Sequence, residues 1–214
     1  MKKVFFSPFL IFTISTIISS VFYLNELKAQ TGTVVDPAGQ SYPWKTMADG
    51  KNWMTEDLNY EIPSGGSASV WSGRKDGRTG KHYNAPAAKA ACQALGNGWR
   101  LPSDQEWQNL IAAYGGGYME RDGDLMKTVG DAELTYQILA KGGESGLSLA
   151  LSGMWTPEGM YPPDTRGFYW SSTLSDSGDG DNTWRYGFIG DKGFVSRNYN
   201  ASDTYYMACR CIND

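Results

Sequence analysis

The chain has 214 residues and a formal net charge of −4, and its Lys and Arg residues form no cluster. These features exclude a basic nucleic-acid-binding surface. One His and three Cys exclude a His-rich metal site and a dense disulfide framework, whereas 26 Gly and 14% aromatic residues indicate many turns around a core of Trp and Tyr.

Residues 1–30 have the pattern of an export signal. Two Lys residues near the start precede an uncharged, mostly apolar run from Val4 to Leu24. The run is long for a signal peptide, and about 20 apolar residues can also span a bilayer as an uncleaved anchor. We therefore expect residues 31–214 to form a single domain that is secreted or held at the cell surface or in the periplasm. Membrane contact is expected only through residues 1–30, if they are not cleaved.

The first part of the expected domain is predicted to contain strands joined by tight turns. Strands are expected at 32–35, 41–47 and 51–54, with turns at 36–39 and 49–50 and a long loop over 61–81. The turns have the Pro, Asp and Gly residues that such connections prefer.

Two helices are predicted next. Asn84 can cap a helix that runs from Ala85 to Leu95 and ends at Gly96. The second begins at Ser103, where Glu106 three residues later forms a capping box, and it ends at Gly115–Gly117. Trp99 and Leu101 alternate before this cap, so both are expected to point into the core that receives Trp107.

Residues 115–168 are the least regular part of the sequence. Thr135–Ala140 suits either a strand or a helix, and 146–155 alternates apolar and small residues in the manner of a buried strand. Further strands are expected at 167–172, 184–189, 194–197 and 205–212, the last of them pairing near the N-terminal hairpin. Strands, two helices and then more strands predict the α+β class.

Five ordered motifs resemble those of the Fibrobacter succinogenes major paralogous domain family. They are DGKNWMTEDLNY at 49–60, GKHY at 80–83 with Ala87 and Ala88, GWRLPSDQEW at 98–107, FYWSST at 168–173 and CRCIND at 209–214. Two departures stand out. Asp57 occupies a position where the family usually has Asn, and six residues separate Cys92 from Trp99 where the family has Cys-Pro-x-Gly-Trp.

The resemblance implies a C-type-lectin-like α+β fold, with two helices packed on short antiparallel sheets and long irregular loops. Such domains are distantly similar to those of formylglycine-generating enzymes. The resemblance implies no established activity, and fold analogy alone cannot supply one.

The resemblance also implies that the last Cys is the one that forms a disulfide. Cys92 would then pair with Cys211, which holds the family position, whereas Cys209 lies two residues away on the same strand face and is the rival partner. An exported chain meets an oxidising compartment, which favours one such bond. The remaining thiol is expected to be a small buried residue.

Two further groups of residues are candidates for ligand or metal binding. Asp176, Asp179, Asp181 and Asn182 offer the oxygen ligands that Ca²⁺ prefers, although ordinary exposed loops use the same residue types.

About half of the aromatic and Arg residues in the last third of the chain should belong to the core. The best exposed candidates for ligand binding are expected to be Trp184, Arg185, Arg197 and Tyr199. The single His, His82, is expected to be a surface residue or a satisfied one. Residues with an expected structural role are Trp53, Trp99, Leu101, Ser103, Glu106, Trp107 and Trp170.

These observations favour a binding module over an enzyme. The expected partner is a glycan or another surface protein, held by the loops between the late strands, with no cofactor apart from the Ca²⁺ just described. The alternatives are a structural component of the cell surface without a ligand site and, less favoured, an enzyme of the formylglycine-generating type, which would need a pair of accessible thiols.

Overall fold

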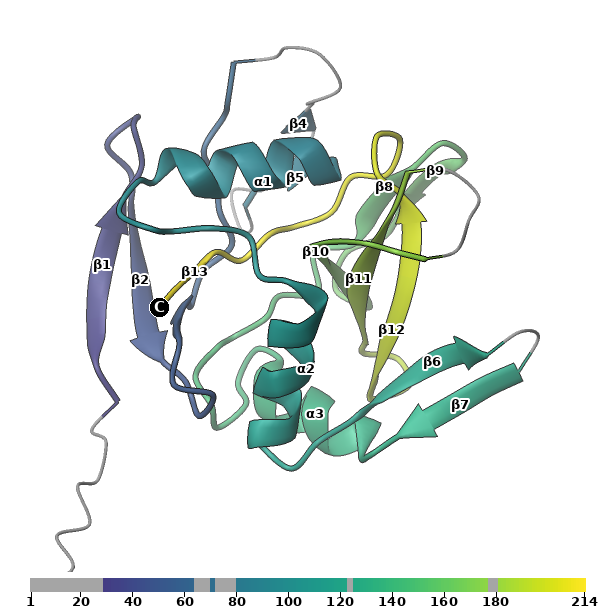
Figure 1. The fold of residues 1–214 in the computed structure, drawn as a ribbon. Helices are drawn as coiled ribbons and strands as arrows, with labels where there is room; N and C mark the ends of the chain where they lie inside the picture. The colour runs from purple at the N-terminus through teal and green to yellow at the C-terminus, as the bar shows by residue number, and fades with distance from the viewer. Residues whose placement is uncertain (1–28, 64–69, 72–79, 123–124, 177–180) are drawn as a thin grey trace, which may run out of the picture.

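The computed structural model describes residues 29–63, 70–71, 80–122, 125–176 and 181–214 (Figure 1). This part of the chain is a mixed α+β structure with three helices and several small sheets. The expected export signal lies outside the described residues, except for its last two positions, and so does most of the predicted loop at 61–81. No helix within the described ranges combines the length and the apolar character needed to cross a membrane.

One sheet joins the two ends of the described chain. It contains β1 (Thr31–Val35), β2 (Ser41–Thr46), β3 (Asn52–Met54) and β13 (Ile212–Asn213), in the order β1-β2-β3-β13. β13 pairs antiparallel to β3, with Ile212 opposite Trp53. The prediction that the closing segment pairs near the N-terminal hairpin is therefore confirmed.

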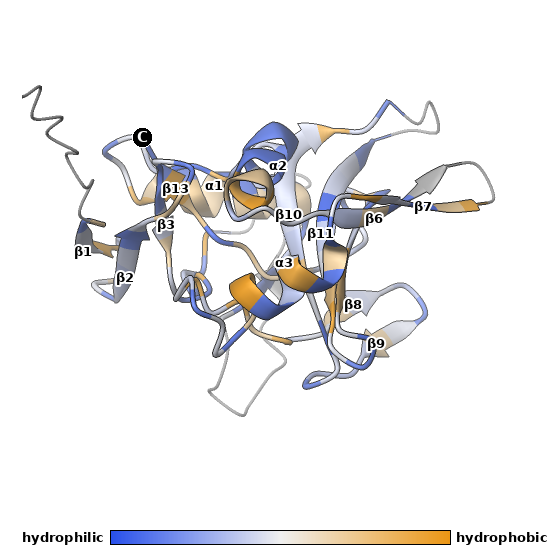
Figure 2. Ribbon diagram, turned by 90° about the horizontal axis from the view of Figure 1, so that it is seen from below, coloured by the Kyte–Doolittle hydropathy of each residue, from blue (hydrophilic) through white to orange (hydrophobic). Residues whose placement is uncertain are grey.

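A larger sheet is built from the second half of the chain. Its order is β10-β11-β12-β6-β7, and its strands are β10 (Arg166–Leu174), β11 (Asn182–Ile189), β12 (Phe194–Ala201), β6 (Tyr118–Asp122) and β7 (Leu125–Val129). Strands β6 and β7 were not predicted, and they extend from the body as a hairpin (Figure 2). Two short pairs complete the strands: β4 (Val70–Trp71) with β5 (His82–Tyr83), and β8 (Met154–Thr156) with β9 (Gly159–Tyr161).

The helices begin at the capping residues that the sequence offers. α1 (Ala85–Ala94) starts at Asn84, whose side chain accepts a hydrogen bond from the Ala87 N–H, and α2 (Asp104–Ala113) has the complete capping box of Ser103 and Glu106. α3 (Ala132–Leu139) starts at Asp131 and occupies the segment that suited either a strand or a helix. The described chain therefore has α3 in addition to the two helices that were expected.

Two predicted strands are wrong. Within 146–155 only the last two residues are in a strand, because Gly146, Ser148 and Gly153 have φ between +56° and +74° and interrupt an extended chain. At 205–212 consecutive residues bridge to different partners, Tyr206 to Trp155 and Met207 to Tyr83, so no continuous strand forms before β13.

The core consists of two adjoining clusters of buried side chains. Trp53 and Trp107 meet in one of them, with ring centroids 4.8 Å apart, and Tyr186 stacks on Trp107 at 5.2 Å. Leu101 and Trp99 are buried in the other cluster, where Trp99 packs against Trp44. The expectation that Trp99 and Trp107 share one core is therefore corrected: the Pro102 entry to α2 separates them, and each is buried in its own cluster.

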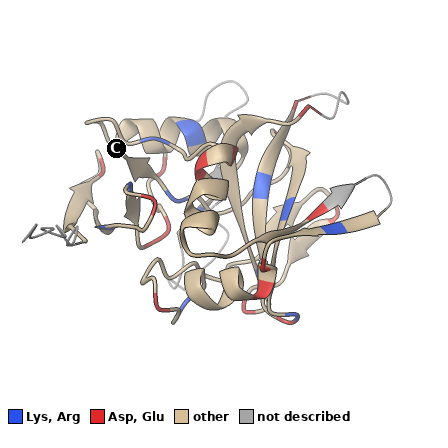
Figure 3. Cartoon of the chain, turned by 60° about the horizontal axis from the view of Figure 1, so that its bottom comes forward, with Lys and Arg blue, Asp and Glu red and all other residues tan. Residues whose placement is uncertain are grey.

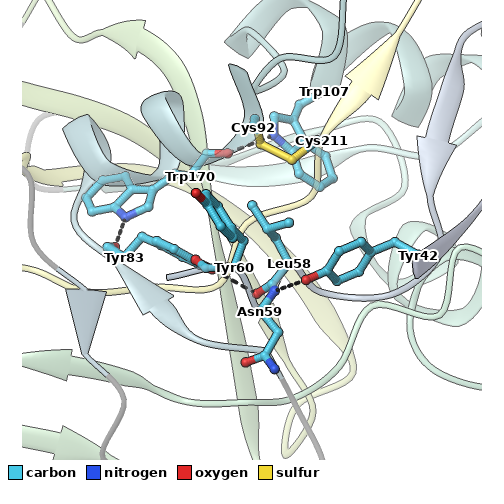
Figure 4. Close-up of a disulfide and its surroundings, with 9 residues drawn as sticks. All are labelled: Tyr42, Leu58, Asn59, Tyr60, Tyr83, Cys92, Trp107, Trp170 and Cys211. Carbon is cyan, nitrogen blue, oxygen red and sulfur yellow. Dashed lines mark hydrogen bonds between the residues drawn. A yellow bond between two sulfur atoms is a disulfide. The ribbon is translucent and has the colours of Figure 1, made fainter. Parts of the chain in front are cut away.

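The buried aromatic side chains are tied together by hydrogen bonds (Figure 4). The Trp107 indole donates to the Trp170 carbonyl (3.3 Å), the Trp170 indole donates to the Tyr83 carbonyl (2.7 Å), and the Tyr83 hydroxyl donates to the Tyr60 carbonyl (2.7 Å). Each of these three buried donors thus has a partner, which removes the penalty for leaving it unsatisfied. Beside this chain of contacts, the disulfide Cys92–Cys211 joins α1 to the segment that enters β13.

Candidate functional site

One concave site is a polar pocket of about 520 Å³, formed by segments far apart in sequence. Residues 55–59 form one side, the loop at 141–150 forms another, and Gln40 and Gly80 complete the wall. The lining residues are Gln40, Thr55, Glu56, Asp57, Asn59, Gly80, Lys141, Gly146, Ser148, Ala150 and Arg210. We call this the polar pocket. Hydroxyl, amide and charged groups dominate it, and none of its lining residues is aromatic.

The floor of the polar pocket is a buried ion pair. Arg210 is only 1% exposed, and its Nε donates to Asp57 Oδ1 at 2.6 Å. The other guanidinium nitrogens donate to backbone carbonyls, Nη1 to Met54 (3.0 Å) and Leu147 (2.7 Å) and Nη2 to Ser148 (2.8 Å). A buried charge that is both paired and hydrogen-bonded in this way holds three chain segments together.

Tyr169 completes the enclosure of Asp57. Its hydroxyl lies 3.2 Å from Asp57 Oδ1, donates to the Ala150 carbonyl (2.9 Å) and accepts from the Ala150 N–H (2.6 Å). Burial, followed by the charge of Asp57, raises the Tyr169 pKa well above its ordinary value, so the phenol stays neutral. Asp57 is thus a buried carboxylate that is paired with Arg210 and lies against the Tyr169 hydroxyl, an arrangement that gives it a structural role.

The rim of the polar pocket contrasts with its floor. Glu56 and Lys141 are exposed, and neither side chain has a hydrogen bond or ion pair within the described part of the chain. Ser148 has a φ of 56°, a conformation that L-residues rarely adopt, and its carbonyl is held by Arg210. Strained backbone of this kind persists only where surrounding contacts hold it, and it is common at ligand-binding sites.

The four residues predicted to bind a ligand do not form one surface. Strand alternation places Trp184 on the face of the large sheet that meets α2 and Arg185 on the opposite face. Tyr199 is 37% exposed and meets Trp184 edge-on at 5.4 Å. Arg185 was expected to be exposed, but it is buried, with an exposed fraction of 9%.

Arg197 is held in a structural network. Its Nε and Nη2 donate to the two carboxylate oxygens of Asp104 at 2.9 and 2.7 Å, its Nη1 donates to Glu120 at 2.9 Å, and its guanidinium carbon lies 3.5 Å from the centroid of a Trp184 ring. A bidentate carboxylate contact fixes the fork geometry of an Arg side chain. The interpretation of Arg197 as a free binding residue is therefore corrected, because its donors secure the start of α2 to the sheet.

Glu106 has the structural role that the capping box predicts. Besides capping α2, its carboxylate accepts two hydrogen bonds of 2.7 Å from Arg100. Burial raises the pKa of this carboxyl, but the hydrogen bonds from Arg100 and Ser103 outweigh it and bring the pKa to about 2. Glu106 therefore stays ionised and paired near neutral pH.

The three cysteines converge beneath α1. Cys92 and Cys211 form the disulfide, and the sulfur of Cys209 lies within 4.8 Å of both. Cys209 is fully buried, and burial raises the pKa of its thiol well above the ordinary value. A thiol of this kind is a poor nucleophile, which is the opposite of the accessible pair that a formylglycine-generating enzyme would need.

The remaining candidates have less structural detail. Of the residues offered for Ca²⁺, Asp179 lies outside the described residues, and Asp176 and Asp181 are exposed, so the Ca²⁺ site stays a prediction. His82 is buried rather than at the surface, and its Nε2 lies 3.3 Å from the Ser152 hydroxyl. Acidic and basic positions are interspersed over the described chain (Figure 3).

The sequence matches the model of the Fibrobacter succinogenes major domain over residues 39–213. The chain belongs to the Fibrobacter succinogenes major domain family. Comparison with curated proteins and with solved structures found no match.

The polar pocket was not predicted from the sequence, although two of the five family motifs contain the residues of its floor. Asp57 stood out as a departure from the usual Asn, and Arg210 was noted only as a neighbour of the cysteines. The two residues are 153 positions apart and meet through folding. The departure at Asp57 was the one signal that could have found the pocket, because a buried carboxylate in place of an amide needs a cation as partner.

Proposed function

We propose that this member of the Fibrobacter succinogenes major domain family is an exported binding module with a C-type-lectin-like scaffold, and that its polar pocket recognises a glycan. The apolar segment at 4–24 supports export to the cell surface, the periplasm or the medium. The α+β arrangement of helices and small sheets, with long connections between them, supports the scaffold.

The observation that carries the proposal is the division of the polar pocket into a satisfied floor and an unsatisfied rim. Asp57 and Arg210 neutralise each other, so they leave a rigid, neutral base. Glu56 and Lys141 above it have no protein partner within the described chain and can accept from and donate to ligand hydroxyls. A sugar presents many hydroxyls and little charge, and it suits a pocket of this size and polarity.

A surface protein is the second candidate partner, and one observation favours it. β7 is the outer strand of the large sheet, and it exposes Leu125 (76%) and Met126 (53%). An edge strand with apolar side chains can accept a strand of another protein. We propose no catalytic role for Asp57 or Cys209, because both side chains are buried.

A glycan array, read with and without a Ca²⁺ chelator, tests the proposal. Hits from the array would then be titrated against Glu56→Gln and Lys141→Ala, each expected to weaken binding about tenfold through loss of one charged hydrogen bond. Glu133→Gln and Lys192→Ala make the same changes on exposed residues outside the polar pocket and should bind normally.

The outcomes separate the alternatives. Loss of signal on chelation would bring the acidic loop at 176–182 into the site. Silence of the array under both conditions would overturn the glycan proposal and favour either a protein partner or a structural component without a ligand site. Equal losses in the pocket variants and in their controls would show that the polar pocket is not where the glycan binds.

A further inference from the structure

Arg185 is a buried cation on the large sheet without a counter-charge. It lies on β11, on the face opposite to the one that meets α2, and only 9% of it is exposed. No carboxylate lies within ion-pair distance of it in the described part of the chain. By contrast, Arg100, Arg166, Arg197 and Arg210 each have a carboxylate partner within 4.0 Å.

Neutral groups hold the guanidinium in place. Its Nε donates to Asn200 Oδ1 at 2.9 Å, its Nη1 donates weakly to the Ser196 hydroxyl at 3.4 Å, and its carbon lies 4.9 Å from the centroid of the Phe168 ring. These contacts use two of the five N–H donors of an Arg side chain. Nη2 has no hydrogen-bond partner within the described residues, so that end of the fork still has donors to offer.

The sheet leaves room for the guanidinium at Gly187. A Cβ at this position would lie 2.7 Å from Arg185 Nη1 and 2.8 Å from the Ser196 hydroxyl. Its φ is not in the left-handed region, so the conformation itself does not require glycine. The missing side chain is therefore what lets the guanidinium lie flat along the strand.

Burial without a counter-charge is unfavourable for the cation. Desolvation lowers the pKa of the Arg185 guanidinium to about 10, while the phenols of Tyr161 and Tyr205 offset it only in part. The group still carries its charge at neutral pH, and an arriving anion would meet little competition from protein carboxylates. Tyr161 is 42% exposed and lies edge-on to Phe168 at 6.2 Å, so it borders the site with an accessible ring.

We propose that Arg185, flanked by Ser196, Asn200 and Tyr161, is a second ligand site that takes the carboxylate of an acidic saccharide. The free end of the fork would donate to the carboxylate oxygens, and the Tyr161 ring would pack against the sugar. The residues of this site are distinct from those that line the polar pocket, and the site does not depend on a ligand there.

The test compares three disaccharides on the purified full chain by isothermal titration and by NMR line broadening. They are a disaccharide ending in glucuronate, its methyl ester, and the neutral glucose disaccharide. The acid is expected to bind at least about tenfold more tightly than the ester, since charged hydrogen bonds are worth about 1.4 kcal/mol or more. Sodium acetate as competitor shows whether the carboxylate alone suffices.

Variants place the effect at Arg185. Arg185→Gln should abolish the preference for the acid, and Gly187→Ala should weaken it by displacing the guanidinium. Arg185→Lys keeps the charge but loses the fork, and it should bind the acid more weakly than the wild type while remaining folded. Arg166→Gln removes a charge from the same sheet and should leave the preference unchanged.

Equal binding of acid and ester, no binding of the acid at millimolar concentration, or an unchanged preference in Arg185→Gln would each overturn the proposal. Loss of the preference in Arg166→Gln as well would reduce it to a general charge effect and also overturn it. These outcomes are distinguishable from failure of the polar pocket, because Glu56→Gln and Lys141→Ala should bind the acidic disaccharide at Arg185 as the wild type does.

Discussion

Arg210 and Arg185 are both buried arginines, but they lie in regions that treat a buried charge in opposite ways. Under the polar pocket, Arg210 has a carboxylate at 2.6 Å and three backbone carbonyls. On the outer face of the large sheet, Arg185 has one amide, one distant hydroxyl and a phenyl ring. The first arrangement pairs the charge within the chain, whereas the second leaves guanidinium donors unused within the described residues, and we propose that an anion binds there.

The comparison shows what burial alone does not reveal about function. A buried arginine that is saturated by its own chain is a structural clamp, and removing its partner leaves an unpaired charge in a low-dielectric interior. A buried arginine with unused donors and no carboxylate partner is expected to contribute less to folding, because no ion pair offsets the desolvation of its charge. Substitutions around the two arginines can test this difference, and those near Arg210 should have the larger effects.

Removal of the disulfide should have the largest effect on stability. Cys92 and Cys211 are 119 residues apart in sequence, and a cross-link over so long a loop stabilises by about 5 kcal/mol in the chain-entropy model. Cys92→Ala should therefore lower the urea midpoint strongly and loosen the closing segment that carries Arg210. Cys209→Ala is the control, because it removes a buried thiol that forms no bond. Equal midpoints for wild type and Cys92→Ala would contradict the prediction.

Breaking the ion pair at Asp57 should come next. Asp57→Ala leaves the Arg210 charge buried without a carboxylate and should cost about 3–5 kcal/mol in urea denaturation. Asp57→Asn, which installs the residue usual in the family, keeps an oxygen that can accept from Arg210 Nε and should cost about 1–2 kcal/mol. If Asp57→Asn lost as much stability as Asp57→Ala, the amide oxygen would not replace the carboxylate; if neither variant lost stability, the ion pair with Arg210 would not hold these segments together.

A third arginine, Arg100, is 35% exposed and pairs with Glu106, so a substitution of Glu106 tests a partly exposed ion pair. Glu106→Gln should cost about 2 kcal/mol at pH 7, a value reduced from the full pKa shift because solvent screens the pair. The carboxyl has a folded pKa of about 2 against an ordinary 4.5, so its stabilisation is present above pH 4.5 and is lost as the pH falls towards 2.

Urea midpoints measured from pH 7 to pH 2 would check this. The difference between wild type and Glu106→Gln should shrink below pH 4.5 and vanish near pH 2. A difference that stays constant over the whole range would show that the loss comes from packing or from the amide and not from the ionised carboxylate.

The parts of the fold that were predictable depend on local chemistry. The capping box of Ser103 and Glu106, the Asn84 cap and the turns at 36–39 and 49–50 involve residues within a few positions of one another, and each is present. The hairpin of β6 and β7 was missed because its place in the sheet depends on a parallel contact with β12, about 77 positions away, which no local pattern encodes.

The expectation that the four ligand candidates are well exposed was wrong for Arg185 for a related reason. Arg185 and Arg197 have the same local signature, an arginine among aromatic residues on a strand. Only folding reveals that Asp104 and Glu120 pair with Arg197, whereas no carboxylate of the described residues pairs with Arg185. Alternation along a strand at 184–189 would have placed Trp184 and Arg185 on opposite faces and divided the predicted surface in two, but it was not applied to this pair.

Substitution of Arg185 should have the smallest effect on stability, and this is the sharpest test of the comparison. Arg185→Met removes a desolvated cation without leaving an unpaired carboxylate, so the free energy of unfolding should change by less than about 1 kcal/mol or rise. Arg210→Met, the matched change, leaves Asp57 buried without its cation and should cost about 3–5 kcal/mol.

Gly187→Ala should destabilise the wild type by about 1–2 kcal/mol. It should destabilise the Arg185→Met variant less, since the added methyl group then meets a flexible thioether instead of the guanidinium at 2.7 Å. Urea denaturation of the four variants, with the double mutant closing the cycle, gives the coupling. A large loss in Arg185→Met would mean that Arg185 is a clamp like Arg210, and that its missing carboxylate has no bearing on recognition.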